Sequence, residues 1–569
     1  MNTSIKTRDL ANSRMNASGK VVKAGEDFEK NRILSDVVPE KYARFHRERL
    51  CHMHDLEFYD TSYNCIGINV KDLLEEKQYT FKAAVRKLNR EIIALTNIQA
   101  GGIGFLNFDA DMAEYVSDET VADMTDELRE LFFDLNVYSR KGCEKAYVTF
   151  NFGLDKTEKG RKVSFALLKA YSLGDEEGNP FVFPNLVFKM AKDVNVAKSA
   201  VNHDVYMAAL KSTSKRMVPT YFNCDSESNK GADPEKIGIM GCRTRVVDNI
   251  YGEKSGLKRG NVACVTLNLV QLAYDSVGNI ERFIGLVKEA MNDAKDSLLY
   301  RYKTLLASAD FSEVYKRRIY KDSEHLDAAL AFRNGTLSIG FIGLWDALAV
   351  IYGKKWNKVS DMERYLDDAF HIVYVMREMT DIYTKETKMN FSLLASAAES
   401  VSGNFAAYDA EHSGKGMEVA EKGYYSNSFH VPVNVEADFM EKIQFEGRFH
   451  HLCNGGSITY IELEEMPEGN IEAVQEIIEF AYENDCNYIG LNFPMDNCND
   501  CGFVGRVASV CPKCGSANIR RLRRVSGYLA EVDRFVKGKK LELLDRLNHD
   551  RWYLKGGVQK NKTDNDTVY

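Results

Sequence analysis

The chain has 569 residues, 44% of them hydrophobic, so it is long enough and apolar enough to fold around a large core. Its formal net charge of −8 disfavours general attraction to nucleic acid or anionic membranes, but it leaves small anionic ligands and a local basic patch open. With only twelve cysteines, no signal-like start and no membrane-length apolar run, the sequence indicates a soluble cytoplasmic protein without a disulfide scaffold.

The first elements predicted along the chain are an arm and a long mixed body. Residues 1–50 are polar and rich in Lys, Arg and Asn, which indicates an arm or a loosely packed helical lead-in. Within the body, 51–490, aromatic and β-branched residues predict strands in 145–154 and 180–190, whereas helical spacing predicts one long helix over 277–308. Strands that alternate with amphipathic helices favour an α/β body, either a barrel or another wrapped parallel sheet.

Two Cys-x2-Cys pairs mark the next segment, residues 491–519. They are Cys498 with Cys501 and Cys511 with Cys514. Two such thiolate pairs can close a tetrahedron around Zn²⁺, and the glycines after Cys501 and Cys514 suit the tight turns that this requires. Four protein thiolates leave no open position on the metal, so the pattern predicts a structural zinc ribbon. A redox dithiol is the alternative interpretation.

The last segment, residues 520–569, begins with the arginine-rich stretch RRLRR and continues into a charged helix-like segment and a polar tail. A zinc ribbon followed by arginines is also typical of a nucleic-acid-binding module, because arginines neutralise phosphates. The acidic character of the remaining chain opposes that interpretation. We therefore expect no nucleic-acid partner.

Residues 523–530, RRVSGYLA, resemble the glycyl-radical signature, with Gly527 as its glycine. A radical on a glycine Cα is delocalised over the neighbouring amide nitrogen and carbonyl, and no side chain forces it out of plane. The flexibility of glycine also suits a loop that a separate activating enzyme must reach. An ordinary turn glycine is the alternative for so short a pattern.

The four-cysteine module followed by the glycyl motif resembles the C-terminal end of the anaerobic, class III ribonucleoside-triphosphate reductases. Further blocks between residues 52 and 530 agree, namely HMHDLEFYDTSYNCIGINV, FVFPNLVF, SKRMVPTYFN, MGCRTRV, RGNVACVTLNL, NGTLSIGFIGL, KGYYSNSFHV and LCNGGSITY. The resemblance implies a ten-stranded α/β barrel with a C-terminal zinc ribbon and glycyl-radical loop. It also implies reduction of ribonucleoside 5′-triphosphates to 2′-deoxyribonucleoside triphosphates, which are DNA precursors.

The resemblance assigns roles to four residues. Gly527 would store the radical, and Cys242 in MGCRTRV would receive it as a thiyl radical and abstract the 3′ hydrogen of the ribose. Cys65 and Asn261 correspond to the second active-site cysteine and the asparagine of formate-using relatives. We therefore expect formate as the reductant, oxidised to carbon dioxide. Taken alone, the cysteines read as core thiols and Asn261 as a turn residue.

Nucleotide contacts are predicted in two glycine-rich turns and one longer region. The turns Asn454-Gly455-Gly456 and Asn334-Gly335 carry backbone N–H groups that could cradle a triphosphate, although neither spells a P-loop and turn glycines are the alternative. Residues 89–115 resemble the region through which relatives form homodimers and bind a deoxynucleotide or ATP effector. The resemblance also implies a radical S-adenosylmethionine activating enzyme as a partner.

The sequence departs from the family pattern in three places. Only about fifty residues precede HMHDLEF, so we expect no full ATP-cone domain and no on/off control by it. Val270 and Gln271 replace a Pro-Arg pair common in relatives, and Ser526 stands where some relatives carry cysteine. Other glycyl-radical enzymes, such as lyases and dehydratases, are the alternative function. They lack the thiolate module, and this chain has no adjacent cysteine pair.

Overall fold

The computed structural model describes residues 16–62, 64–74, 79–308, 333–397, 399–412, 418–524 and 527–550. Within these ranges, eleven strands form one wrapped sheet. The strands are β1 (Cys51–Met53), β2 (Cys65–Ile68), β3 (Ile103–Phe105), β4 (Val148–Phe152), β5 (Asn185–Met190), β6 (Thr220–Asn223), β7 (Arg259–Asn268), β8 (Thr336–Ile342), β9 (Asn390–Ala395), β10 (Thr459–Glu462) and β11 (Tyr488–Asn492).

The sheet consists of two parallel halves that meet in antiparallel junctions. Strands β2 to β6 run parallel to one another, as do β7 to β9 and the pair β10–β11. The halves meet where β2 pairs with β7 and where β11 pairs with β6, and β1 pairs with β7 outside this path. Between β9 and β10, Gly455 N–H donates to the Leu393 carbonyl at 2.8 Å, and Ala395 N–H to the Gly456 carbonyl at 3.0 Å. These bonds close the ten-stranded barrel that the resemblance implies.

Burial explains why these segments form strands. Strands β2 to β9 are buried along their whole length, as expected for parallel strands covered on both faces. The strands predicted in 145–154 and 180–190 are confirmed as β4 and β5. The long helix predicted over 277–308 is confirmed as α9 (Ile280–Ala307).

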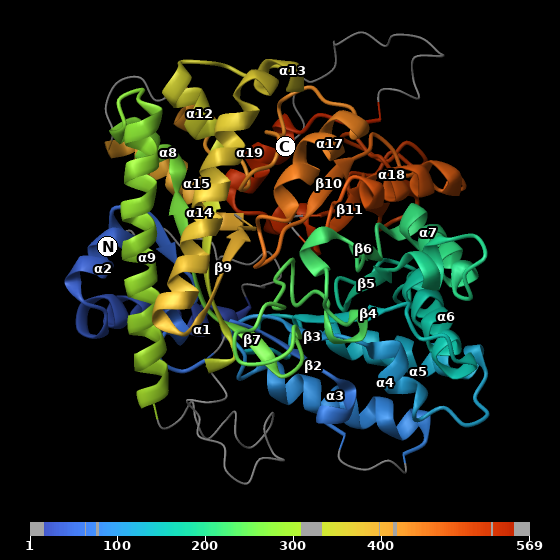
Figure 1. The fold of residues 1–569 in the computed structure, drawn as a ribbon. Helices are drawn as coiled ribbons and strands as arrows, with labels where there is room; N and C mark the ends of the chain where they lie inside the picture. Colours follow the sequence, from blue (N-terminus) through green and yellow to red (C-terminus); the bar gives the residue numbers. More distant parts are fainter. Residues whose placement is uncertain are drawn as a thin grey trace.

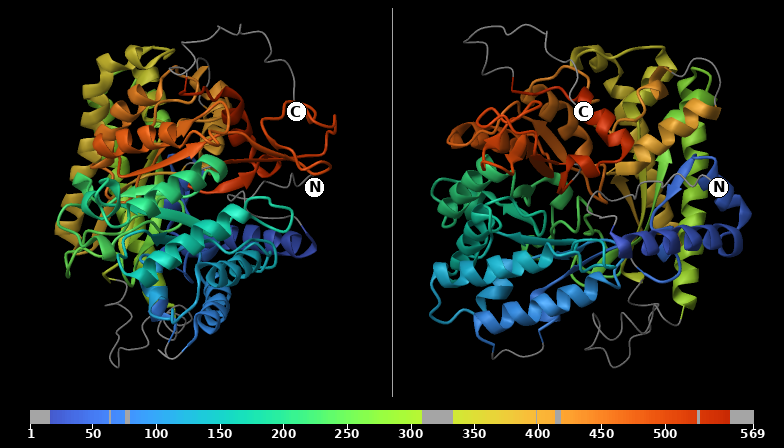
Figure 2. Two further views of the ribbon diagram at one scale, coloured as in Figure 1. Left: turned by 90° about the vertical axis from the view of Figure 1, so that its right-hand side faces the viewer. Right: turned by 180° about the vertical axis from the view of Figure 1, so that it is seen from behind.

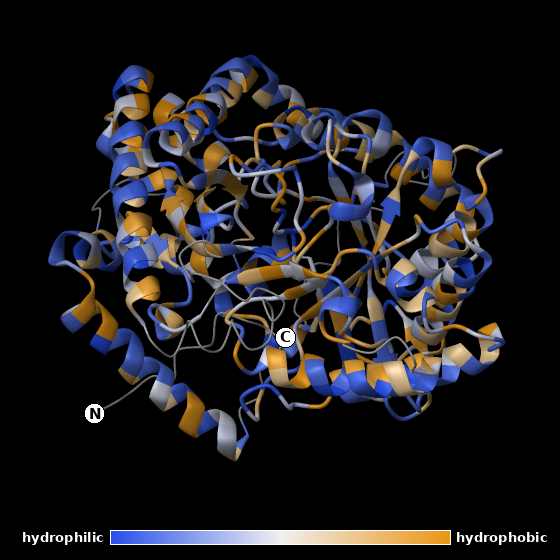
Figure 3. Cartoon of the chain, turned by 60° about the horizontal axis from the view of Figure 1, so that its bottom comes forward, coloured by the Kyte–Doolittle hydropathy of each residue, from blue (hydrophilic) through white to orange (hydrophobic). Residues whose placement is uncertain are grey.

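Helices form an outer layer around the strands in every view (Figures 1 and 2). Along them, hydrophobic and hydrophilic residues alternate, which leaves an apolar side for the sheet (Figure 3). Besides α9, they are α1 (Ala17–Arg32), α2 (Glu40–Arg47), α3 (Phe81–Thr96), α4 (Phe108–Ala113), α5 (Val121–Leu135), α6 (Glu158–Leu173), α7 (His203–Arg216), α8 (Leu269–Asp275), α12 (Leu344–Tyr352), α13 (Val359–Met362), α14 (Leu366–Thr387), α15 (Glu399–His412), α16 (Glu418–Glu421), α17 (Phe439–His450), α18 (Ile471–Glu483) and α19 (Lys537–Asp545). In the described part of the chain, no helix combines the length and apolarity needed to span a bilayer.

A buried loop, residues 237–247, lies between β6 and β7 and is called the finger loop below. Asn151 of β4 holds it in two directions, because Ile239 N–H donates to the Asn151 side-chain oxygen at 2.8 Å and the Asn151 amide donates to the Ile239 carbonyl at 2.9 Å. Thr149, also on β4, donates to the Gly241 carbonyl at 3.1 Å. On the opposite wall, Arg245 N–H donates to the Gly455 carbonyl at 2.9 Å. The loop is thus fixed to both halves of the barrel.

A second, smaller sheet lies near the C-terminal end of the described chain, before α19. It contains β12 (Met495–Cys498), β13 (Val504–Gly505), β14 (Ile519–Arg524) and β15 (Leu529–Glu531), all antiparallel in the order β13-β12-β14-β15. The turn between β14 and β15 contains Gly527, so this sheet carries the predicted radical loop. Ser526 and the polar tail, 551–569, lie outside the described residues.

Candidate active site

A cavity of about 160 Å³ lies at the tip of the finger loop. Two residues predicted to be catalytic, Cys65 and Cys242, line it together. Asn261 does not line it but sits opposite Cys65 in the β2–β7 pairing. With its amide nitrogen turned toward acceptors, Asn261 donates to the Ala263 carbonyl at 2.8 Å and the Thr336 carbonyl at 3.2 Å, so it joins β7 to β8.

Cys65 is packed against a pair of glycines at the start of β3. Gly102 N–H donates to the Cys65 sulfur at 3.3 Å. A Cβ at position 101 would lie 2.8 Å from the same sulfur and 1.9 Å from the Asn64 carbonyl oxygen, so only glycine fits there. Burial raises the pKa of Cys65 to about 12. The side chain is therefore a neutral thiol near pH 7, suited to donating hydrogen.

Cys242 forms the tip of the finger loop, directly after Gly241, whose φ of +65° is a left-handed conformation that glycine adopts without strain. The Tyr147 hydroxyl lies beside this turn, 3.2 Å from where a Cβ of Gly241 would be, and Tyr147 lines the cavity together with Cys242. Burial raises the pKa of Cys242, against the opposing influence of the Arg243 charge and of Tyr147. This sulfur is also an S–H group near neutral pH.

Gly527 lies directly against the main chain of Cys242. A Cβ at position 527 would fall 1.8 Å from the Cys242 carbonyl oxygen and 2.5 Å from its Cα. This close approach is what requires glycine at position 527. The structure therefore brings the predicted radical glycine and the predicted thiyl cysteine into contact.

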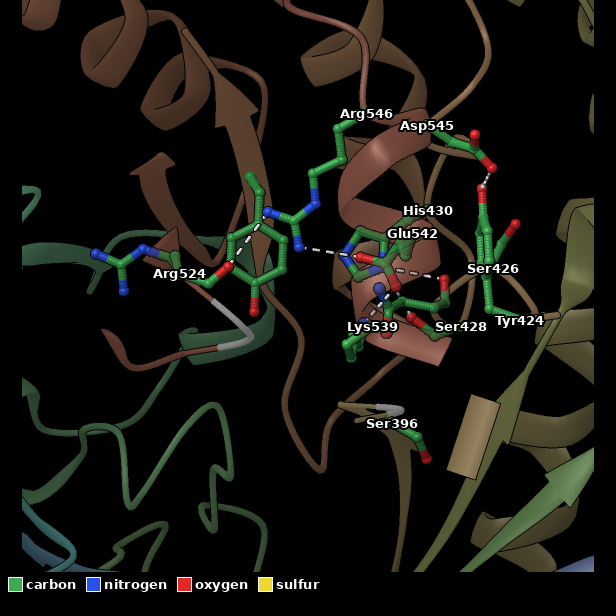
Figure 4. Close-up of polar contacts among 12 residues, drawn as sticks. Ser396, Tyr424, Ser426, Ser428, His430, Arg524, Lys539, Glu542, Asp545 and Arg546 are labelled. Carbon is green, nitrogen blue, oxygen red and sulfur yellow. Dashed lines mark hydrogen bonds and ion pairs between the residues drawn. The ribbon is translucent and has the colours of Figure 1, made fainter. Parts of the chain in front are cut away.

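Buried charges anchor the segment on both sides of Gly527. The Arg524 guanidinium donates to the Gly527 carbonyl at 3.1 Å. Arg546 donates to the Arg524 carbonyl at 3.2 Å and to Glu542 at 3.0 Å, and Glu542 accepts a further bond from Lys539 (Figure 4). Because Lys539, Glu542 and Arg546 belong to the last described helix and the residue that follows it, α19 helps to hold the radical loop in place.

Tyr528, next to the predicted radical glycine, connects the loop to the cavity wall. Its hydroxyl donates to the Glu399 carboxylate at 2.8 Å, and Glu399 both begins α15 and lines the cavity. Its ring stacks on Phe183, with centroids 5.9 Å apart, and meets Tyr147 edge-on at 5.7 Å. The loop is therefore docked by aromatic contacts as well as by hydrogen bonds.

The four cysteines of the predicted zinc ribbon meet in space. Their sulfurs all lie within 4.8 Å of one another. Cys498 and Cys514 are 3.5 Å apart and Cys501 and Cys511 3.6 Å apart, measured between sulfurs. Tetrahedral zinc with Zn–S bonds of about 2.3 Å places its sulfurs about 3.8 Å apart. The donor set therefore fits Zn²⁺, which would hold this sheet together without an open position for catalysis.

The arginines that follow the ribbon are engaged within the protein. Arg520 pairs with Glu531 at 3.1 Å and Arg523 with Asp496 at 2.5 Å. Arg521 donates to the Ala508 carbonyl. These pairings connect β14 to its neighbours and oppose the interpretation of RRLRR as a nucleic-acid-binding segment.

The two glycine-rich turns predicted to bind triphosphate do not line the cavity, although Gly456 packs against the lining residues Arg243 and Leu394. Gly455 and Gly456 N–H groups donate to the carbonyls of Leu393 and Cys453 at 2.8 and 3.0 Å, and the Asn454 side chain bonds Leu393 N–H and Asp248. The Asn334 carbonyl accepts from Arg259 at 2.6 Å, and the Gly335 carbonyl from Asn390 at 3.4 Å. The turns therefore brace the barrel and the finger loop, and their role in binding phosphate stays a prediction.

Several cavity residues were not singled out from the sequence. They are His52, His54, Tyr147, Ser396 and Glu399. Both histidines stand in the block HMHD, and Tyr147 stands in a segment that periodicity identifies only as a strand. Ser396 and Glu399 follow directly after β9, at a strand-to-helix turn where barrel enzymes commonly carry functional residues. Their position directly after the buried strand β9 is the feature from which they could have been predicted.

The whole chain was compared with known proteins. A family model described as "Anaerobic ribonucleoside-triphosphate reductase" matches residues 9–549. The chain belongs to this reductase family. The reductases of Escherichia coli (strain K12) and Enterobacteria phage T4 are 28% and 26% identical to it, each over 95% of this chain and over 83% and 97% of their own lengths.

Solved structures show the same fold. An anaerobic ribonucleotide reductase superposes with a TM-score of 0.72 at 18% identity, over 94% of this chain and 88% of its own. The Thermotoga maritima reductase, solved with dATP and CTP, gives 0.70 at 17% identity, over 93% and 92%. A glycerol dehydratase from Clostridium butyricum gives 0.54 at 11% identity, over 94% and 73%. Since the barrel extends to other enzymes, the family match decides the activity, which is the reduction of ribonucleoside triphosphates to deoxyribonucleoside triphosphates.

Proposed function

We propose that this reductase works by a radical stored on Gly527 and passed to Cys242, with formate as the reductant and Cys65 taking part in the reduction. The observation that carries the proposal is the contact between Gly527 and the main chain of Cys242. A hydrogen atom transferred from the Cys242 sulfur to the Gly527 Cα needs such proximity, because transfer requires the reacting atoms at or near van der Waals contact. Cys65 lines the same cavity, beside the finger loop.

The proposed cycle is a series of hydrogen-atom transfers among Gly527, the two cysteines and the ribose. The Gly527 radical takes the hydrogen atom of the Cys242 thiol, and the resulting thiyl radical abstracts the 3′ hydrogen of the ribose. The 2′ hydroxyl then leaves as water, and Cys65 donates a hydrogen atom to the 2′ carbon. The Cys65 sulfur recovers a hydrogen atom from formate, whose remaining electron, with one proton, reduces the 3′-keto sugar as carbon dioxide is released. Cys242 finally returns hydrogen to the 3′ carbon, which restores the stored radical. The net reaction converts a ribonucleoside triphosphate, formate and one proton into a deoxyribonucleoside triphosphate, carbon dioxide and water.

Asn261 and the first turn of α15 complete the proposed substrate site. Asn261 lies opposite Cys65 and fixes the adjoining strands, so its predicted contact with the sugar or with formate would need its amide to turn. The first turn of α15 contributes Glu399 and Ser400 to the cavity, with Ser396 just before it. A helix N-terminus attracts phosphate through its unpaired N–H groups, which supports a triphosphate position here.

Effector, dimer and activation sites follow the family pattern. The region 89–115 spans the end of α3, the loop at Gly101 and Gly102 that touches Cys65, and α4, so a nucleotide effector on α3 would lie one loop away from the active site. The T. maritima relative was solved with dATP in the specificity site, which supports such an effector. We also propose a homodimer, structural Zn²⁺ on the four cysteines, and activation by a radical S-adenosylmethionine enzyme in the cytoplasm.

The decisive experiment is an anaerobic assay with the activating enzyme, one ribonucleoside triphosphate, and formate present or omitted. We expect a doublet paramagnetic signal that collapses when the protein carries deuterated glycine, and deoxynucleotide formation only with formate. Product made with a dithiol and without formate would contradict the reductant and the role of Cys65. Absence of any glycyl signal in active protein would contradict Gly527.

A further inference from the structure

The net reaction consumes one proton per turnover when formate is the reductant, so this inference rests on the proposed function. Formate oxidation releases two electrons and one proton, whereas reduction of the sugar with loss of water uses two electrons and two protons. A dithiol would release two protons and leave no deficit. A formate-dependent site at the centre of a barrel therefore needs a route by which a proton reaches the 2′ oxygen.

Three imidazole rings lie in a row between α2 and the cavity. His46 of α2 and His52 of β1 have ring centroids 5.2 Å apart, and His52 and His54 meet edge-on at 4.8 Å. His52 and His54 line the cavity. The row therefore runs from the buried face of α2 to the active site, and imidazole is the side chain best suited to exchange protons near neutral pH.

His52 has the properties of a transfer group rather than of a fixed structural contact. Its side chain is 9% exposed, yet its Nδ1 has no hydrogen-bond partner in the described structure. A buried polar atom without a partner is destabilising, so its presence calls for a reason. Burial and the neighbouring His54, His46, Arg49 and Lys30 lower the pKa of His52, so the ring is neutral and can accept a proton on one nitrogen while releasing one from the other.

His54 continues the row toward the substrate through hydroxyl groups. Its Nε2 lies 2.8 Å from the Thr266 hydroxyl, which lies 2.7 Å from the Ser396 hydroxyl at the cavity wall. A Cβ at Gly340 would fall 2.0 Å from the Ser396 oxygen and 3.1 Å from that of Thr266, so the glycine keeps this hydroxyl pair in place. Hydroxyl groups both donate and accept, which lets them relay a proton.

We propose that His52 and His54 form the path that delivers the proton with which the 2′ hydroxyl leaves as water. The proton passes from the histidine pair to the 2′ oxygen, directly or through Thr266 and Ser396. The C2′–O bond then breaks with its electron pair on oxygen. His46, which is buried and accepts the Met53 N–H on its Nδ1 at 3.0 Å, returns a proton to the pair through its Nε2. Asp55 and Glu57 line the same cavity and would stabilise the transient positive charge, whereas Arg49 and Lys30 face His52 and oppose it.

The test compares His52→Gln and His54→Gln with the control His451→Gln, an exposed histidine that directly follows α17 and does not line the cavity. Glutamine keeps hydrogen-bonding capacity but does not carry a proton at these pH values. We expect the Gly527 signal and the KM values for nucleotide and formate to be unchanged. We expect kcat of the two cavity variants to fall at least about tenfold, more steeply as the pH rises, and to recover when imidazole is added.

Thr266→Val gives a second variant that leaves both histidines untouched. It removes the hydroxyl relay at nearly constant volume, and we expect a lower kcat with a larger solvent deuterium isotope effect. Unchanged kcat in all three variants, or a loss that imidazole does not restore and that does not depend on pH, would overturn the path. Wild-type turnover without formate would overturn it too, and because this is read in the wild type alone, it separates failure of the reductant from failure of the histidines.

Discussion

Gly527 and Cys242 touch through their main chains, with no room for a side chain between them. Gly527→Ala places a methyl group 1.8 Å from the Cys242 carbonyl oxygen, so the loop between β14 and β15 cannot dock in its present position. We expect complete loss of the radical signal and of activity, and faster proteolysis within the loop. Gly515→Ala is a control in a turn where no atom lies within 4 Å of the added carbon, although its φ of +77° predicts mild destabilisation. A docked, protease-resistant loop in Gly527→Ala would contradict the packing argument.

Cys242→Ser separates storage of the radical from its use. The hydroxyl O–H bond is too strong to yield its hydrogen to a glycyl radical, so deoxynucleotide formation should disappear while the doublet signal persists. The measurement is paramagnetic resonance alongside product analysis on the same activated sample. Cys453→Ser, a buried cysteine outside the cavity lining, should keep its activity. Loss of the doublet in Cys242→Ser would contradict the assignment.

Tyr147→Phe tests the hydroxyl beside the finger-loop tip. The substitution keeps the ring contacts with Phe183 and Tyr528 and removes only the hydroxyl, which lies next to Gly241 and lowers the pKa of the Cys242 thiol. Loss of one polar interaction of this kind costs about 1 kcal/mol, so we expect kcat to fall by about five- to tenfold with little change in KM. The isotope effect with 3′-deuterated substrate should increase, because hydrogen abstraction becomes slower. An unchanged isotope effect would argue against a role in positioning the thiol.

We expect removal of zinc to weaken the docking of the loop that contains Gly527. Because β14 connects the four-cysteine turns to Gly527, Cys511→Ser or a strong chelator should loosen the sheet and lower the yield of radical upon activation. Thermal unfolding should shift to lower temperature, and metal analysis should find one zinc per chain in the untreated protein. Full radical yield in zinc-free protein would contradict this coupling.

Asp111 should impose a distinctive pH dependence on stability. Burial raises its pKa from 3.8 to about 7, although Val70 N–H donates to its carboxylate at 2.6 Å. Between these pH values the folded state binds more protons than the unfolded state, so the contribution of Asp111 to the free energy of unfolding decreases as the pH rises. Asp111→Asn removes this dependence. Urea unfolding at pH 5 and pH 7 should therefore show a variant that gains stability relative to wild type at the higher pH.

The sequence was most informative where chemistry demands particular residue types at short spacing. Cys498, Cys501, Cys511 and Cys514 were predictable as one metal site because four thiols at this spacing have few other uses. Cys65, Cys242 and Gly527 were predictable through motifs, but nothing local to any of them says that they meet. Their proximity depends on the finger loop entering the barrel and on the last sheet folding back over it.

Contacts between residues that are far apart in the sequence explain which features of the site could not be predicted. Gly455 and Gly456 have the composition of a phosphate-binding turn, yet their N–H groups bond Leu393 and Cys453. A glycine pattern does not reveal whether its N–H groups are free, because the partner strand lies some sixty residues away in the chain. Glu399 and Tyr147 likewise belong to opposite halves of the barrel and become neighbours of the cysteines only through strand register.

The close packing of Gly527 against Cys242 also implies that activation and turnover occur at different times. The face of this residue that touches Cys242 is covered while the loop is seated, so no other macromolecule reaches it in that state. If Gly527 carries the radical as proposed, a molecule with the loop docked can turn over substrate but cannot be activated again, and a molecule that is being activated cannot turn over. We therefore expect the fraction of time that the loop is undocked to determine the rate at which inactive protein is activated.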